Sequence, residues 1–180
     1  VSSVRHSKAK QGKFFTAYAP YGYLKTADQR LIPDNEAAPV VQRIFNMAME
    51  GVPKAHIAKI LNNEGIPAPF MLRKLRGQNF PCRTVNKKSI WGTAAIVSIL
   101  KDQRYTGDAV YGKVKPKVAG SSQNCIVPRE QWIIVPNVNK AIISREEFEA
   151  VNAMFQKRIH YQKKKAVPLA GMVCCAECKH

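Results

Sequence analysis

The sequence predicts an α+β fold in which a helical, helix-turn-helix-like bundle is followed by a small antiparallel sheet and a long C-terminal helix. Apolar residues recur at spacings of three and four within residues 37–48, 57–61 and 96–100, and the period changes to two after residue 107. The 180 residues are 46% apolar, which is enough for one core and a small appended module. This fraction excludes disorder of the whole chain, and no apolar stretch approaches the roughly 20 residues of a membrane span.

An aromatic turn and a hairpin are the first predicted elements. The turn covers residues 19–23, where Pro20 fixes φ and Gly22 permits a positive φ. Residues 23–32 then predict a short hairpin.

Two helices joined by a short turn follow the hairpin. Asp34 and Asn35 are both suitable N-caps for the first helix, which Gly51 is expected to end. Pro53 marks the start of the second helix and Gly65 its end. The apolar face of the first helix consists of Ala37, Val40, Val41, Ile44, Phe45 and Ala48, and that of the second of Ile57, Ala58, Ile60 and Leu61.

A third helix is expected from Thr93 to near Asp102, with Ile96, Ile99 and Leu100 on its buried face. The stretch 66–90, rich in Pro, Gly, Arg and Lys, separates it from the second helix. An ordinary helix-turn-helix motif allows only about three or four residues between its helices. Either the motif is a different one, or residues 66–90 form an insertion that faces nucleic acid.

The chain after Gly107 has the pattern of strands. Val110, Gly112 and Val114 alternate with Tyr111, Lys113 and Lys115, which predicts a strand with an apolar and a basic face. Residues 131–135 predict a more deeply buried strand and residues 141–143 a short third one, with a connecting loop at 116–128.

A capping box is predicted at the start of the last helix, because Glu147 follows Ser144 at the spacing of three residues that this motif requires. The helical face that follows is Phe148, Val151, Phe155 and Ile159. From periodicity we also expect Phe45 and Trp132 to be buried.

The charge is strongly basic: 29 Lys and Arg stand against 12 Asp and Glu, a net charge of +17. Three long windows, 1–27, 65–101 and 150–176, contain no acid at all. Solubility does not require such windows, so the interpretation is a polyanion partner, nucleic acid.

The candidate DNA contacts lie in the N-terminal arm, the 66–90 stretch, the third helix and the basic face of the first C-terminal strand. The arm suits the minor groove, where flexible Arg and Lys side chains bind. The predicted DNA-binding residues are Arg5, Lys8, Lys10, Lys13, Arg73, Lys74, Arg76, Arg83, Lys87, Lys88, Thr93, Ser98, Lys101, Arg104, Lys113 and Lys115.

The cysteines point to a metal rather than to disulfides. Cys175 and Cys178 form a C-x₂-C pair, the spacing with which two thiolates bind zinc, but four ligands are needed and the sequence ends at His180. Five cysteines, an odd number, argue against a secreted disulfide framework and favour a reducing compartment. The basic start is no secretory signal, and the missing initiator methionine leads us to expect a piece of a longer protein.

Catalytic motifs are not evident. The sequence has no recognisable Ser/His/acid constellation and no phosphate-binding glycine loop, and its four histidines are scattered. We expect this chain to catalyse nothing alone and to take no small-molecule substrate.

Several motifs recur together in the order of a known family. They are Ala19-Pro20-Tyr21-Gly22-Tyr23, the helix 36–45, residues 57–62 with Gly65-Ile66-Pro67, Trp91 with Ile96, Ile99 and Leu100, Tyr105-Thr106-Gly107, Ile142-Ile143-Ser144 with Glu147-Phe148, and residues 169–173 before Cys175 and Cys178. This order resembles the "recombinase" DNA-binding domain of the large serine recombinases, which include phage integrases and transposon-encoded resolvase/invertase relatives. The resemblance covers about residues 18–178, and the stretch 66–90 is longer than the family pattern.

The resemblance implies a division of the chain. Residues 1–17 would be an interdomain linker, 18–165 the DNA-binding domain on an attachment half-site, and 166–180 the start of a zinc ribbon. Cys175 and Cys178 would be two of four zinc ligands, and Cys174 would not be one. The parent would carry the serine nucleophile on another domain, dimerise on each site, form a tetramer in synapsis and act on double-stranded DNA in the bacterial cytoplasm.

Three other functions remain open from the sequence. A stand-alone transcriptional repressor would bind a palindrome through its own dimer interface. A basic RNA-binding module would prefer single strands and expose stacking aromatics. A nuclease fragment is disfavoured by the absence of clustered His and acidic residues.

Overall fold

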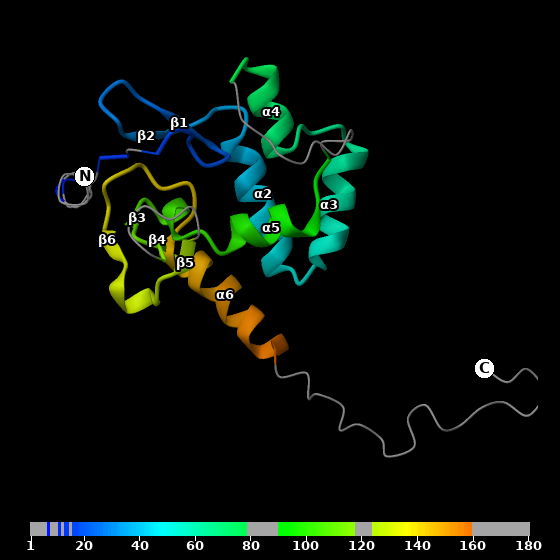
Figure 1. Cartoon of the computed structure of the whole chain (residues 1–180). Helices are drawn as coiled ribbons and strands as arrows, with labels where there is room; N and C mark the ends of the chain where they lie inside the picture. Colours follow the sequence, from blue (N-terminus) through cyan, green and yellow to red (C-terminus); the bar gives the residue numbers. More distant parts are fainter. Residues whose placement is uncertain are drawn as a thin grey trace, which may run out of the picture.

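The computed structural model describes residues 7, 11, 13, 14, 16–78, 90–117 and 124–159. It confirms the α+β class, since the described chain holds five helices and small antiparallel two-stranded sheets. In Figure 1, α5 (Thr93–Leu100) crosses in front of α2 (Ala38–Met49), α3 (Lys54–Asn63) lies beside them, and α6 (Arg145–Ile159) lies below. The elements are β1 (Tyr23–Lys25), β2 (Leu31–Pro33), α2 (Ala38–Met49), α3 (Lys54–Asn63), α4 (Pro69–Leu75), α5 (Thr93–Leu100), η1 (Gln103–Thr106), β3 (Ala109–Tyr111), β4 (Val114–Pro116), β5 (Asn124–Ile126), η2 (Arg129–Gln131), β6 (Ile133–Val135) and α6 (Arg145–Ile159).

Helix α2 is the centre of the hydrophobic core. It packs against α3, α5 and α6, and α3 also packs against α5. Val41, Ile44 and Phe45 are 0% exposed, which confirms the predicted apolar face of this helix. Burial of large apolar side chains is the main favourable term in folding, so α2 holds the helical bundle together.

The ends of α2 and α3 are confirmed as glycine caps. Gly51 has a φ of +83°, and the N–H of Val52 behind it donates to the carbonyl of Met47 at 3.0 Å. Gly65 repeats this arrangement with a φ of +69°. A residue with a side chain is strained at a positive φ, which is why glycine stands at both positions.

The predicted N-caps of α2 are wrong by a few residues. The helix begins at Ala38, and its N-cap is Ala37, whose side chain cannot accept a hydrogen bond. Asp34 lies in the preceding turn, where its Oδ1 accepts the N–H of Glu36 at 3.2 Å. Its other carboxylate oxygen is engaged by Arg76, so this residue stabilises a tertiary contact instead of a helix end.

The stretch 66–90 contains a helix that the sequence reading missed. Helix α4 spans Pro69–Leu75 and buries none of its residues. Its first four residues are all apolar and it spans only seven residues, which is too short to show a clear helical period in the sequence. Residues 79–89 lie outside the described residues.

The sheet consists of separate two-stranded ladders, β1–β2, β3–β6 and β4–β5. The hairpin over 23–32 is confirmed, with Tyr23 opposite Pro33 and Lys25 opposite Leu31. The predicted two-faced strand over 110–115 is wrong, because Gly112 has a φ of +78° and divides it into β3 and β4. All three residues of β3 are buried, whereas Val114 in β4 is 54% exposed.

The other two predicted strands also differ from the structure. Strand β6 is shorter than expected and is not deeply buried, since Ile134 is 37% exposed. Residues 141–143 form no strand; the N–H groups of Ile142 and Ile143 both donate to the carbonyl of Tyr105, at 3.0 and 3.1 Å. Trp132, expected to be buried, is only half-buried, because it directly precedes β6 of the β3–β6 ladder and is not part of the main core.

The capping box at the start of α6 is confirmed. Ser144 N–H donates to the Glu147 carboxylate at 2.9 Å, and the Glu147 N–H donates to Ser144 Oγ at 3.2 Å. Phe148 and Val151 are buried against α2, while Phe155 is half-buried.

Long-range hydrogen bonds join the N-terminal hairpin to the segment before α6. The Tyr23 hydroxyl donates to the carbonyl of Lys140 at 2.9 Å, and the Leu31 N–H donates to Asn139 Oδ1 at 2.9 Å. In the described part of the chain, no helix is both long and apolar enough to cross a membrane.

Candidate nucleic-acid interface

The buried carboxylates of the described chain are each paired with an arginine. Asp34 accepts from Arg76 at 2.6 Å, Asp108 accepts from Arg145 at 2.8 Å, and Asp102 pairs with Arg104. Ion pairs inside a protein satisfy groups that would otherwise be costly to bury. The most buried negative charges are therefore neutralised within the fold.

The pKa values of two of these carboxyls reflect the pairing. Burial raises the pKa of Asp34, but the hydrogen bonds from Arg76 and from the Glu36 N–H outweigh it and hold the pKa below its ordinary value. Burial likewise opposes ionisation of Asp102, and Arg104 and Lys113 reverse that effect and lower its pKa. Both carboxylates are charged at neutral pH.

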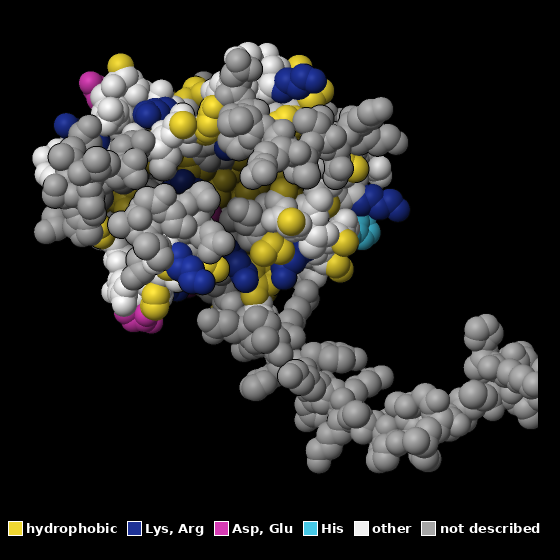
Figure 2. All heavy atoms as spheres, in the orientation of Figure 1, with side chains coloured by type: hydrophobic (Ala, Val, Ile, Leu, Met, Phe, Trp, Pro, Cys, Tyr) yellow, Lys and Arg dark blue, Asp and Glu magenta, His cyan; other side chains and the backbone are white. Residues whose placement is uncertain are grey.

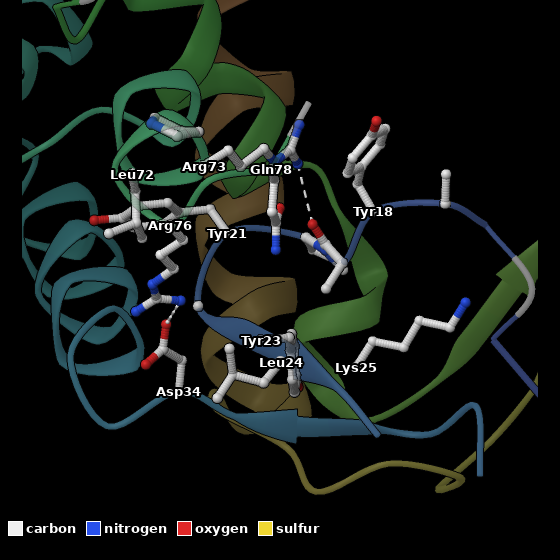
Figure 3. Close-up of a pocket in the computed structure, with 15 residues that line it drawn as sticks. Tyr18, Tyr21, Tyr23, Leu24, Lys25, Asp34, Leu72, Arg73, Arg76 and Gln78 are labelled. Carbon is white, nitrogen blue, oxygen red and sulfur yellow. Dashed lines mark hydrogen bonds and ion pairs between the residues drawn. The ribbon is translucent and has the colours of Figure 1, made fainter. Parts of the chain in front are cut away.

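A cavity of about 160 Å³ lies between the aromatic turn, the start of β1 and α4 (Figure 3). Arg73 of α4 and Arg76, the C-cap residue of this helix, both reach toward this cavity. Arg73 Nη2 donates to the carbonyl of Ala19 at 3.0 Å, and its guanidinium lies 5.5 Å from the centre of the Tyr18 ring. Burial lowers the pKa of this guanidinium. Both arginines thus attach α4 to the body of the domain.

Lys74 stands between these two arginines in sequence and differs from both. It is exposed, and no hydrogen bond or ion pair engages its side chain within the described residues. Since Arg73 and Arg76 fix the helix, Lys74 is held on a rigid element with its charge available to a ligand.

Helix α5 and its C-cap residue Lys101 provide three of the predicted contact residues. Thr93, Ser98 and Lys101 are all exposed, and the N-cap Gly92 provides no side-chain acceptor for the first N–H groups. The exposed residue between them, Ala94, is small. A short helix with small exposed side chains can approach the edges of base pairs closely, as groove-binding helices do.

Besides Arg73 and Arg76, two further predicted contacts are engaged inside the fold. Arg104 pairs with Asp102, and Lys113 lies 3.3 Å from Asp102 and 5.3 Å from the centre of the Trp132 ring. These interactions give the two side chains a structural role. Lys13 is exposed at the start of the described chain, and its carbonyl accepts a hydrogen bond from the Tyr111 hydroxyl at 2.7 Å.

The remaining predicted residues cannot be placed. The side chain of Lys115 in β4 is not described. Outside the described residues lie Arg5, Lys8, Lys10, Arg83, Lys87, Lys88, Cys175 and Cys178. Among the residues that the structure describes, no group of three His, Cys, Asp or Glu side chains could hold a metal ion.

Further exposed cations were missed in the sequence. Within the described ranges, no hydrogen bond or ion pair engages the side chains of Arg30, Lys59, Lys117 and Lys140. For Lys59 the signal was available, because its position falls off the buried stripe of Ile57 and Leu61. Figure 2 shows Lys and Arg spread over the visible face, whereas acidic side chains lie mainly at its left edge.

A helical bundle with exposed lysines and internally neutralised carboxylates has the features of a nucleic-acid-binding domain. A model of the Recombinase family matches residues 35–158, well over half of the chain. The chain belongs to this family, the DNA-binding domain of the large serine recombinases.

Two solved structures are similar in fold. One, on the sequence requirements of the Listeria innocua prophage attP site, is 17% identical with a TM-score of 0.51, and the match covers 99% of this chain and 62% of that one. The other, a crystal structure of an LSR–DNA complex, is 18% identical with a TM-score of 0.56, and the match covers 98% of this chain and 45% of that one. This chain thus spans less than two thirds of either protein.

Proposed function

We propose that this chain binds double-stranded DNA with sequence specificity, at one half of an attachment site, as part of a serine site-specific recombinase of a phage or other mobile element. The observation that carries the proposal is the division of charge: buried carboxylates are paired with Arg76, Arg104 and Arg145, while several exposed lysines, Lys74 and Lys101 among them, have no side-chain partner among the described residues. The family supports it, as do the two similar structures, which concern an attP site and an LSR–DNA complex.

In this proposal the phosphate contacts come from cations on separate rigid elements. Lys74 on α4 and Lys101 at the C-cap of α5 neutralise phosphates. Lys13 belongs to the basic N-terminal arm, which binds in the minor groove. Each released counterion adds to the salt dependence of binding, so about eight neutralised phosphates make the affinity fall roughly as the seventh power of salt concentration.

Sequence is read by α5 in the same proposal. Thr93 and Ser98 carry hydroxyl groups that can donate to or accept from base edges, each such contact contributing on the order of 1–3 kcal/mol of discrimination. Strand cleavage belongs to a catalytic domain on the same polypeptide, in an assembly that dimerises on each site and forms a tetramer at synapsis. Cys175 and Cys178 would supply two thiolates to a zinc ribbon, and the site of action would be the bacterial cytoplasm.

The test is selection of a randomised duplex library by this chain at two salt concentrations. We expect enrichment of one asymmetric half-site and a steep loss of affinity with salt. Enrichment of a palindrome would favour a repressor instead, and preference for single-stranded RNA would favour an RNA-binding module. A chain that binds no duplex would contradict the proposal.

A further inference from the structure

The hairpin β4–β5 exposes a pair of branched apolar side chains. Val114 and Ile126 lie directly opposite each other across the ladder. Val114 is 54% exposed and Ile126 is 86% exposed, the highest value among the large apolar side chains of the described chain. Cross-strand neighbours on one face have Cβ atoms about 5 Å apart, so the two side chains form one continuous apolar surface.

The base of this hairpin is firmly anchored. Val127, the next residue after Ile126, is 6% exposed and its N–H donates to the carbonyl of Lys113 at 3.0 Å. Trp132 Nε1 donates to the carbonyl of Val127 at 2.8 Å. The apolar pair is thus presented on a fixed support, so a ligand that contacts it orders little chain on binding.

The surroundings of the pair are basic. Residues 109–129 include Lys113, Lys115, Lys117 and Arg129 and contain no Asp or Glu, although Lys113 is paired with Asp102 from outside this range. Lys117, one residue past β4, is exposed and has no partner among the described residues. The charged residues of the hairpin itself are all cations. A ligand that presents apolar edges flanked by anions complements this surface, whereas a protein surface without acidic residues does not.

We propose that the exposed apolar face of the β4–β5 ladder lies against the minor groove of duplex DNA, with Val114 and Ile126 against the sugars and base edges and Lys117 at a phosphate. Proteins that bind this groove commonly use apolar side chains as wedges beside cations. The inference rests on the proposed function, because it names a second contact region on the same DNA, separate from α5.

The experiment compares the wild-type chain with Ile126→Ala on the duplex that the wild type selects. The variant binds about five- to tenfold more weakly, the scale of losing the contact of a branched apolar side chain, and its salt dependence is unchanged. Lys117→Gln instead lowers the slope of log affinity against log salt by about one. Protection of adenine N3, in the minor groove, from dimethyl sulfate is lost with Ile126→Ala, while protection of guanine N7, in the major groove, is retained.

Met154→Ala is the matched control, since it also removes an exposed apolar side chain, 42% exposed, from a helix that carries Glu146 and Glu147 in its first turn. Its affinity stays at the wild-type value. Circular dichroism checks that each variant is folded. If Ile126→Ala does not fold, Val114→Ser is used for the same test.

Each contrary outcome has its own meaning. If the wild type binds no duplex, the proposed function falls and the hairpin inference falls with it. If the wild type binds and both hairpin variants keep its affinity and its N3 protection, the hairpin inference alone is overturned. If the variants keep DNA affinity but reduce self-association in sedimentation, the apolar pair is a protein interface and the inference is also overturned.

Discussion

The hydroxyl of Tyr105 donates a hydrogen bond of 2.8 Å to the backbone carbonyl of Tyr21, across 84 residues of sequence. Tyr105 is 2% exposed, and its ring stacks on Tyr23 at 5.9 Å between ring centres. The bond joins the aromatic turn to the segment that follows α5. Burial raises the pKa of this hydroxyl well above its ordinary value, so it remains a donor throughout the neutral range.

Tyr105→Phe tests this bond. The variant leaves the Tyr21 carbonyl without its donor in a buried place, and we expect the free energy of unfolding to fall by about 1–2 kcal/mol. Tyr21→Phe is the control, because the Tyr21 hydroxyl donates at 3.3 Å to the carbonyl of Pro67 in a less buried place. Urea denaturation measures both variants; equal losses would contradict a special role for the buried bond.

Arg76→Gln tests the ion pair with Asp34. Asp34 is 4% exposed, and removal of its cation should lower the free energy of unfolding by about 1–3 kcal/mol at pH 7. The control Arg43→Gln breaks an exposed pair with Glu64 and should leave stability nearly unchanged.

The same ion pair predicts a pH dependence. The pKa of Asp34 is lower in the folded chain than its ordinary value of 3.8, so the pair stabilises the fold fully above about pH 4. This contribution is lost as the pH falls through the folded pKa. The stability gap between wild type and Arg76→Gln should therefore narrow in denaturation curves as the pH falls below 3.8, and a gap that is equal at pH 3 and pH 7 would exclude the charge as its cause.

Gly107→Ala and Gly51→Ala separate two costs of replacing a glycine. Both glycines have a positive φ, +87° and +83°, so both variants are strained by about 1–2 kcal/mol. A Cβ at Gly107 would also lie 2.6 Å from the carbonyl oxygen of Asn139, whereas nothing lies within 4 Å at Gly51. We expect Gly107→Ala to lower the free energy of unfolding by about a further 1–3 kcal/mol, and to lower the thermal midpoint more than Gly51→Ala does. Equal midpoints would mean that the Asn139 segment moves aside freely.

Lys101→Gln tests the role of α5 in DNA binding. Loss of one phosphate contact should lower the slope of log affinity against log salt by about one. Arg43→Gln removes the same charge from a residue already paired with Glu64 and should leave the slope unchanged. If both variants lower the slope equally, net charge and not a local contact governs the binding.

Much of the helical framework could be predicted because its signals are local. Gly51 and Gly65 end two helices, and Ser144 with Glu147 begins another, all through contacts within a few residues. Helix α4 was missed because it spans only seven residues, of which the first four are all apolar, so no helical period can be detected in it. The division at Gly112 was missed because alternation of side chains does not reveal a positive φ.

The candidate site was harder to predict than the fold. Lys74 and Arg76 look equivalent in the sequence, yet Arg76 is engaged by Asp34, 42 residues away, and Lys74 is not engaged among the described residues. Pairing of this kind depends on tertiary packing, which charge counting does not contain. Sequence could therefore predict a basic ligand-binding surface but could not tell which of its cations are available.

The hydrogen bonds of Tyr23 and Leu31 to the segment before α6 have a consequence for the order of synthesis. They span 117 and 108 residues, so a ribosome releases the N-terminal hairpin long before its partners Lys140 and Asn139 exist. The hairpin is synthesised before its partners, but its hydrogen bonds to them form late, because closing such long loops is slow. A nascent chain that stops before residue 139 leaves the Tyr23 hydroxyl without its acceptor at Lys140, and only translation through the start of α6 allows the domain to close.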